Sequence, residues 1–154
     1  MRSAAAQQSE HGSTATDQLR QSTLGAMAFA LATSEIALQR AENPVVRTFA
    51  QLETEEQQAF TIARQMNNLP LPGPSYMDAQ KQQMLQQLQA LSGGQFDQMY
   101  IQGQTLGHQE LLQLFTSLSR TPSMPAEQML GIVGVPAIRS HLAMLQGIQQ
   151  QMRG

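Results

Sequence analysis

Residues 69–74, LPLPGP, separate two helical halves of the chain. Three prolines in five residues remove backbone donors and clash with a preceding helical turn, so no helix continues through this stretch. The backbone must therefore extend here. The sequence predicts a long connection between the helices on either side.

Two amphipathic helices are predicted before this connection. From Thr16 to Arg40, apolar residues recur at helical spacing, as in the series Leu24, Ala28, Leu31 and Leu38. The pair Asn43-Pro44 then begins a second helix, with Asn as the N-cap and Pro in the first turn. This second helix is predicted to end near Asn67.

One short helix and two long helices are predicted after the connection. The short helix covers the Gln-rich segment 77–91 and is stopped by Gly93-Gly94. The long helices cover 95–119 and the segment that ends near Met152, with a kink expected at Pro136. Neither strand-like alternation nor a fixed repeat is present, so we predict an all-α four-helix bundle with a short extra helix in its long crossover connection.

The predicted domain organisation is a flexible leader over residues 1–16 and one helical bundle domain over residues 17–152. The leader consists of small and polar residues without apolar periodicity, which bury too little surface to offset the entropy of ordering. Its Ala4-Ala5-Ala6-Gln7 run is compatible with the start of an exported chain. No apolar region follows Arg2, so no intact signal peptide is visible.

Composition excludes several classes of function. The chain has 154 residues, 41% of them hydrophobic and only 13% charged, with a formal net charge of -2. Its nine basic residues are scattered, so binding to nucleic acid or to an anionic membrane surface is not expected. The absence of cysteine excludes thiol nucleophiles, disulfides and Cys-built metal sites. No uninterrupted apolar run reaches the roughly 18 residues of a membrane span, so no membrane span is expected. With these partners excluded, we expect a protein partner, whose identity the sequence leaves open.

Several motifs resemble one bacterial family. They are the run NPVVRTFA at 43–50, the run LSGGQFDQMY at 91–100, the downstream His108, and the run VPAIRSHL at 135–142. Over roughly residues 17–148 the chain is similar to the exported, ferritin-like family of unknown function whose members are often labelled predicted outer membrane proteins. The resemblance implies a ferritin-like bundle in the periplasm or cell envelope. Members usually carry an acidic residue followed by His in the second helix, whereas this chain has Glu56-Gln57.

Four polar side chains fall on apolar helical stripes and form the candidate metal site. They are Glu35, Glu56, His108 and His141. If the second and third long helices are parallel, the four residues lie within about 8 Å of one another along the bundle axis. Carboxylates and imidazoles together suit a transition metal, so the candidate cofactor is Fe, Mn or Zn in the bundle core.

The same residues allow a metal-free alternative, in which Glu35 pairs with His141 and Glu56 pairs with His108 in the core. The chain contains no Glu-x-x-His motif of the di-iron type and no Gly-x-Ser-x-Gly elbow of an acyl-transfer enzyme. The absence of these motifs favours a non-enzymatic bundle with a degenerate metal site, and the family resemblance implies that it acts in the periplasm, in envelope stress or as an interaction module. The alternative is a metal-binding or oxidase-type ferritin-like protein.

Overall fold

The computed structural model describes residues 4–154, with side chains from residue 14 onward. The described chain forms five α-helices and one short 3-10 helix, and it contains no strand. The helices are α1 (Ala4–Arg40), α2 (Pro44–Met66), α3 (Ala79–Ala90), α4 (Gly93–Ser119) and α5 (Pro125–Arg153), and the 3-10 helix is η1 (Pro74–Tyr76). The predicted all-α class is confirmed.

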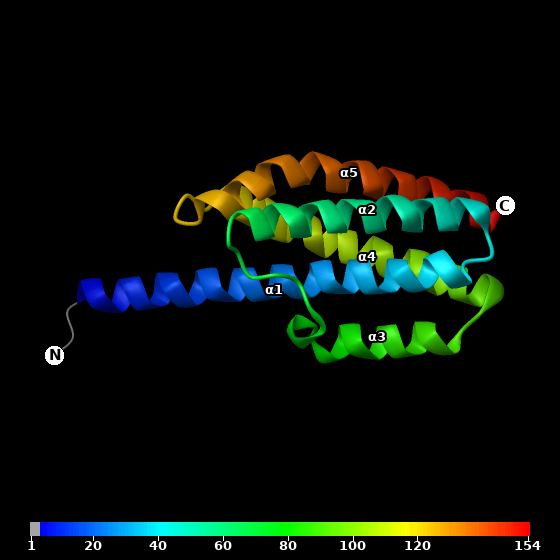
Figure 1. Cartoon of the computed structure of the whole chain (residues 1–154), viewed down its shortest axis with the longest axis horizontal. Helices are drawn as coiled ribbons and strands as arrows, with labels where there is room; N and C mark the ends of the chain where they lie inside the picture. Colours follow the sequence, from blue (N-terminus) through cyan, green and yellow to red (C-terminus); the bar gives the residue numbers. More distant parts are fainter. Residues whose placement is uncertain (1–3) are drawn as a thin grey trace.

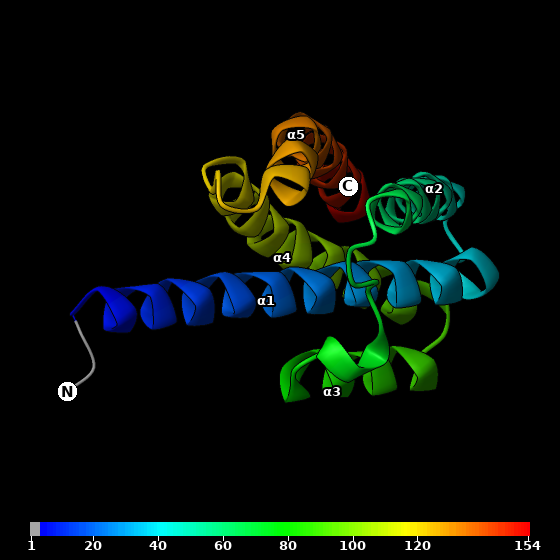
Figure 2. The same ribbon diagram turned by 60° about the vertical axis from the view of Figure 1, so that its left-hand side comes forward.

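The four long helices lie side by side, and α3 packs on the outside (Figure 1). Helix α1 contacts α2 and α4, and α5 contacts the same two helices from the other side. The colour gradient in Figure 1 shows that α2 and α4 run in one direction while α1 and α5 run in the other. The first turns of α1 project beyond the other helices (Figure 2). Because α2 and α4 are parallel, the chain crosses the length of the molecule between them.

The turn between α1 and α2 is fixed by side-chain caps. The Asn43 side chain accepts a hydrogen bond from the Val45 backbone N–H at 2.9 Å, and Pro44 occupies the first turn of α2. The buried Asp97 carboxylate, in the second turn of α4, accepts the Glu42 and Asn43 backbone N–H groups at 3.1 and 2.8 Å. This contact sets the level of α4 against α2.

A buried cluster of charged side chains holds the beginning of the crossover. Arg64, only 1% exposed, donates from Nε to the Pro70 carbonyl at 2.7 Å and from Nη2 to Glu127 at 3.2 Å. Arg20 on α1 donates from Nε to the same Glu127 carboxylate at 2.9 Å. Glu127 on α5 thereby joins α1 and α2, and Arg64 attaches the proline-rich segment to the same cluster.

Glycines let α5 approach α4 closely. A Cβ atom at Gly131 would lie 2.6 Å from the Ser119 nitrogen and 2.7 Å from the Phe115 oxygen, so only glycine fits there. At Gly134 a Cβ atom would meet the Phe115 ring at 2.3 Å. The close approach brings the inner faces of α4 and α5 together.

The structure agrees with the predicted order of helices and changes one boundary substantially. The first helix begins at Ala4 instead of Thr16, so the backbone at 4–16 continues α1. The short crossover helix, the two long helices after it and the turn at Asn43-Pro44 lie where the sequence places them, to within a few residues. Residues 1–3 lie outside the described residues, and the division into leader and bundle domain stays a prediction.

Within the described residues, α5 is the one helix long and apolar enough to cross a membrane by length and composition. Its most apolar window has a mean hydropathy of 1.2, and 33% of that window is buried. This is weak evidence for a membrane span, because a core helix of a folded domain passes the same test. The expectation that the chain lacks a span stays a prediction.

Candidate metal centre

Three buried side chains from three helices meet at one point in the core. Glu53 on α2, His108 on α4 and His141 on α5 each offer one ligand atom, and these atoms lie within 4.8 Å of one another. Glu53 Oε2 is 2.9 Å from His108 Nε2 and 2.6 Å from His141 Nδ1. Glu53 and His108 are fully buried, and His141 is 7% exposed. We call this group the Glu53 triad.

Helical spacing accounts for the inward position of each member. Glu53 follows the buried Phe49 by four positions and Ala50 by three. His108 shares its face of α4 with Leu111 and Phe115, and His141 shares its face of α5 with buried isoleucine and leucine neighbours, Ile138 and Leu145. The three helices therefore present these polar groups to a common interior.

Each member of the triad is also held on its far side. Gln57 Nε2 donates to Glu53 Oε1 at 2.8 Å, and His108 Nδ1 donates to the Gln104 carbonyl at 2.8 Å. His141 Nε2 lies 3.1 Å from Glu56 Oε2. Metal-binding histidines and carboxylates in proteins are oriented by outer partners of these kinds.

The protons on the two imidazoles are constrained by these partners. All four ring nitrogens face oxygen atoms, but a neutral imidazole carries only one N–H. The Gln104 carbonyl can only accept, so the hydrogen of His108 belongs on Nδ1. The lone pair of His108 Nε2 then faces the Glu53 carboxylate, unless a second proton or a metal cation lies between them. His141 has a carboxylate at each ring nitrogen, Glu53 at Nδ1 and Glu56 at Nε2, so in its neutral form one of its lone pairs also faces a carboxylate.

The acid–base properties of the metal-free centre follow from burial and charge. Burial alone would raise the pKa of Glu53, but hydrogen bonds and charge attraction from His108 and His141 outweigh it and lower the pKa to about 2. Burial would lower the pKa of His141, and the two neighbouring carboxylates raise it above its ordinary value. The pKa of Glu56 is raised, chiefly by burial. Glu53 is thus anionic at neutral pH.

Aromatic rings enclose one side of the triad. The Phe49 ring centroid lies 6.0 Å from that of His108 and 5.4 Å from that of His141, both edge-on. Tyr100 follows beyond Phe49 at 6.3 Å, and its hydroxyl is hydrogen-bonded to Ser34 at 2.7 Å. Phe49 therefore excludes water from this side, while the half-buried Glu56 lies on another.

Unpaired oxygens gather around the same residues. Among the described residues, the buried side-chain atoms without a hydrogen-bond partner are Thr54 Oγ1, Glu56 Oε1, Gln57 Oε1 and Gln104 Oε1. All four are oxygens, and three of them belong to residues that already contact a member of the Glu53 triad. Three of these unpaired atoms, Glu56 Oε1, Gln57 Oε1 and Gln104 Oε1, are carboxylate or amide oxygens, and Thr54 Oγ1 is a hydroxyl that can also donate.

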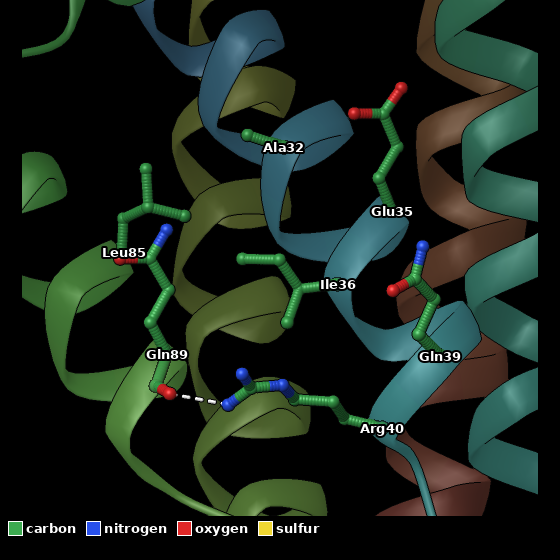
Figure 3. A pocket seen from close by; sticks show the side chains of 7 residues that line it. All are labelled: Ala32, Glu35, Ile36, Gln39, Arg40, Leu85 and Gln89. Atoms are coloured by element: carbon green, nitrogen blue, oxygen red, sulfur yellow. Dashed lines mark hydrogen bonds between the residues drawn. The ribbon is translucent and has the colours of Figure 1, made fainter.

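The structure brings together three of the four residues predicted as metal ligands. His108 and His141 point inward as expected, and Glu56 contacts His141 from the edge of the site. Glu35 does not join them, because it is exposed on α1 and lines an open groove between α1 and α3 (Figure 3). The predicted pairs are also replaced: Glu53 Oε2 contacts both imidazoles, and Glu56 contacts His141 instead of His108.

Sequence reasoning missed Glu53 because it selected the wrong stripe of α2. The apolar stripe that singles out Glu56 in the sequence runs through Val45, Phe49, Leu52 and Phe60. Phe49 is buried, but Val45 is 45% exposed and Leu52 is 40% exposed. The buried stripe is shifted by one residue and contains Glu53 and Gln57. A usable signal is present in Phe49, Glu53 and Gln57, which follow one another at four positions, with Ala50 three positions before Glu53.

The chain belongs to the family described as "Domain of unknown function (DUF4142)", which matches residues 1–148. No curated protein and no solved structure matches the chain. The description of this family assigns no chemistry to the Glu53 triad.

Proposed function

We propose that this protein binds one divalent transition-metal ion through Glu53, His108 and His141. The observation that carries the proposal is the converging set of one carboxylate and two imidazoles, each with an outer hydrogen-bond partner. Two histidines and one carboxylate form a recurrent ligand set for Fe²⁺ and for Zn²⁺ in proteins. Mn²⁺ accepts the same donors. Glu56 would act through His141, as the acceptor for its second ring N–H.

The spacing of the donor atoms fits such an ion. Two donors about 2.1 Å from a metal, at right angles, are about 3.0 Å apart. The separations of 2.9 and 2.6 Å from Glu53 Oε2 are close to this value. A cation would also occupy the position where lone pairs of His108 and His141 face an anionic carboxylate. Three protein donors leave further positions on the metal for other ligands.

A second candidate is a metal-free cluster that fixes the packing of three helices. It is favoured by the short contacts of Glu53 Oε2 with both imidazoles, which form without any ion when the rings are protonated. Two imidazolium groups and the carboxylates of Glu53 and Glu56 would then balance in charge. In this case the protein is a structural or interaction bundle.

We also propose a ferritin-like bundle and a periplasmic or envelope location for the protein. The parallel direction of α2 and α4, with a crossover between them, supports the first proposal. The resemblance to exported ferritin-like proteins supports the second. Fractionation of the cells that make the full-length protein would test the location.

The test of metal binding is metal content by mass spectrometry. Purified protein is incubated separately with Fe²⁺, Mn²⁺, Zn²⁺ and Cu²⁺ and then desalted. We expect about one ion per chain with at least one of the first three metals, and loss of that ion in Glu53→Gln and in the double variant His108→Ala/His141→Ala. Glu35→Gln is the matched control, because it removes an exposed carboxylate outside the triad. Wild-type protein that retains no metal, or a Glu53→Gln variant that retains it fully, would overturn the proposal in favour of the metal-free cluster.

A further inference from the structure

The side of the bundle formed by α2 and α5 carries most of the exposed large hydrophobic side chains. Among the described residues eleven such side chains are exposed, of which four lie on α2 and four on α5. Helix α3 packs against α1 and α4 on the other side of the bundle and does not cover them (Figure 2). On α5, Met129, Ile132 and Val133 are 65%, 56% and 58% exposed. Exposed apolar side chains gathered on one face mark a contact surface.

The outer face of α5 is one uncharged line of residues. Its six members follow one another at intervals of four, three, four, three and four, and all are exposed: Met129, Val133, Pro136, Ser140, Ala143 and Gly147. They lie on the opposite side of the helix from the buried Ile138 and Leu145. We call this line the α5 stripe. Its spacing is that of a helix that packs lengthwise against another helix.

The two ends of the α5 stripe differ in size. The first end carries the large side chains of Met129 and Val133, and the second carries Ala143 and Gly147. A Cβ atom at Gly147 would meet nothing within 4 Å, so no contact within the chain requires glycine there. Glycine inside a helix nevertheless lowers helix stability. The second end therefore has room for a large side chain from outside the chain.

We infer that the α5 stripe pairs with the same stripe of a second copy of this chain, in the antiparallel direction. With the twofold axis at the level of residue 138, Met129 faces Gly147 of the second copy, and Val133 faces Ala143 of the second copy. Each large side chain then meets a small one, as close packing requires. Parallel pairing would instead bring the two Met129 side chains together and leave a gap between the two Gly147 residues.

The charges of α5 favour a second copy over a membrane surface. Helices that lie on membranes are rich in Lys and Arg on their polar face, whereas Arg139 and Arg153 are the only such residues of α5. The α5 stripe itself carries no charge, so two copies do not repel each other along it.

The size of the α5 stripe sets the strength of the dimer. From Met129 to Gly147 it is about 27 Å long, and the exposed Ile132 and Met144 widen it on either side. One pair of helices of this length buries less than the roughly 800 Å² per partner of a standard stable interface. The dimer is therefore reversible and dissociates on dilution.

Cross-linking tests the direction of the pairing in the full chain, which contains no cysteine of its own. Val133→Cys and Ala143→Cys are treated with a short bis-maleimide, each alone and as an equimolar mixture. Antiparallel pairing places position 133 of one copy opposite position 143 of the other, while identical positions lie about 15 Å apart along the helices. We expect a cross-linked dimer in the mixture and its loss in either variant alone. Equal cross-linking of each variant with itself, or none in any sample, would overturn the inference.

Sedimentation at increasing protein concentration tests the dimer without chemical modification. The average mass of wild-type protein should rise from that of one chain toward that of two. Gly147→Leu fills the space predicted for Met129 of the second copy, and Val133→Glu adds a charge at an exposed position, so each should raise the dissociation constant about tenfold or more. Gln86→Glu, exposed on α3, is the control and should leave it unchanged.

Three results of the sedimentation test would contradict the α5 dimer. Wild-type protein that stays monomeric at about 1 mM overturns it. So does a dimer that both α5 variants leave at full strength, because the contact would then lie elsewhere. Monomeric protein that floats with vesicles of anionic phospholipid would assign the same face to a membrane.

Discussion

At the scale of single residues, the hydrogen-bond partners of two histidines govern the chemistry of the core. His108 has its Nδ1 hydrogen held by a backbone carbonyl, so only its Nε2 is free to bind a proton or a metal. His141 has carboxylates on both ring nitrogens. Under the proposed function, a proton and a metal ion would therefore compete for the same nitrogen atoms, His108 Nε2 and His141 Nδ1.

The first prediction concerns His108→Ala in metal-free protein. Removal of the ring leaves the buried Glu53 carboxylate with one imidazole fewer, so the free energy of unfolding should fall by about 1–3 kcal/mol. Chemical denaturation in the presence of a chelator measures it. Gln109→Ala, the exposed neighbour on α4, should change the same quantity by about 0.5 kcal/mol or less. Equal effects of the two substitutions would contradict the pairing.

The second prediction concerns the pH dependence of the metal-free protein. Glu53 has a folded-state pKa of about 2 instead of 4.5, so its contribution to stability is present above pH 4.5 and is lost as the pH falls toward 2. His141 has a pKa raised above 6.5, so its contribution is complete below pH 6.5 and is lost as the pH rises through the raised value. Metal-free stability should therefore be greatest between about pH 4.5 and 6.5.

Denaturation midpoints measured across that pH range, with and without metal, check the second prediction. Because a metal ion would displace the proton that the raised pKa keeps on His141, metal binding should release protons and should strengthen as the pH rises. A stability of metal-free protein that increases steadily from pH 6 to pH 9 would be inconsistent with the shifted pKa of His141.

Sequence reasoning found the two histidines and misplaced one carboxylate, for reasons visible at single residues. On α1 apolar side chains occur on every side, so the stripe through Glu35 could not be distinguished from the buried stripe through Ala30, Ser34 and Ala37. On α2 the buried stripe is the more polar one, because Glu53 and Gln57 find partners in the core. A pattern of hydrophobicity cannot reveal a polar group whose partner comes from another helix.

At the scale of helices, the close packing of α4 and α5 positions His141 opposite His108. The third prediction compares two glycines of α5. Gly131→Ala should lower the free energy of unfolding by about 1–3 kcal/mol, because its Cβ atom would meet rigid backbone atoms of Phe115 and Ser119. Gly147→Ala, with nothing within 4 Å of its added Cβ, should raise it by up to about 1 kcal/mol.

Thermal denaturation of the two alanine variants measures this difference, since both substitutions have the same effect on the unfolded chain. A Gly131→Ala variant as stable as Gly147→Ala would mean that α5 stands further from α4 than described. The same variant should also bind metal more weakly if the displaced helix carries His141 away from Glu53.

The fourth prediction concerns the charged cluster at the crossover. Glu127→Gln removes the carboxylate that pairs with the buried Arg64 and with Arg20, so the free energy of unfolding should fall by about 3–5 kcal/mol. Glu55→Gln, an exposed carboxylate on α2, should have an effect within about 0.5 kcal/mol. Urea denaturation distinguishes them, and a Glu127→Gln variant of wild-type stability would show that Arg64 finds another partner.

At the scale of the whole molecule, two features of the sequence matter: the signals that separate the helices, and the low charge density. The order and direction of the helices follow from few signals, chiefly the prolines at 70–74, Asn43-Pro44 and the glycines at 93–94. These local signals do not depend on distant partners, which is why helix order was predictable. The start of α1 could not be predicted, because residues 4–16 carry neither an apolar stripe nor a capping signal.

The fifth prediction is tolerance of acid. When carboxylates are protonated, the positive charge comes from nine Lys and Arg residues and three His residues in a chain of 154 residues. Repulsion between so few charges is weak, so helicity followed by circular dichroism should persist to about pH 4. A cooperative loss of helicity well above pH 4 would contradict it.

The large sequence separation of the residues in the Glu53 triad affects the kinetics of folding. Glu53 finds its two partners 55 and 88 residues further along the chain, on helices that lie on the far side of the proline-rich crossover. Contacts this distant in sequence form only after the intervening loops have closed. A refolding chain should thus regain its helices first and the Glu53 triad last, together with any affinity for metal that the proposed function gives it. The rate of metal capture would then report the final docking of α5 onto α2 and α4.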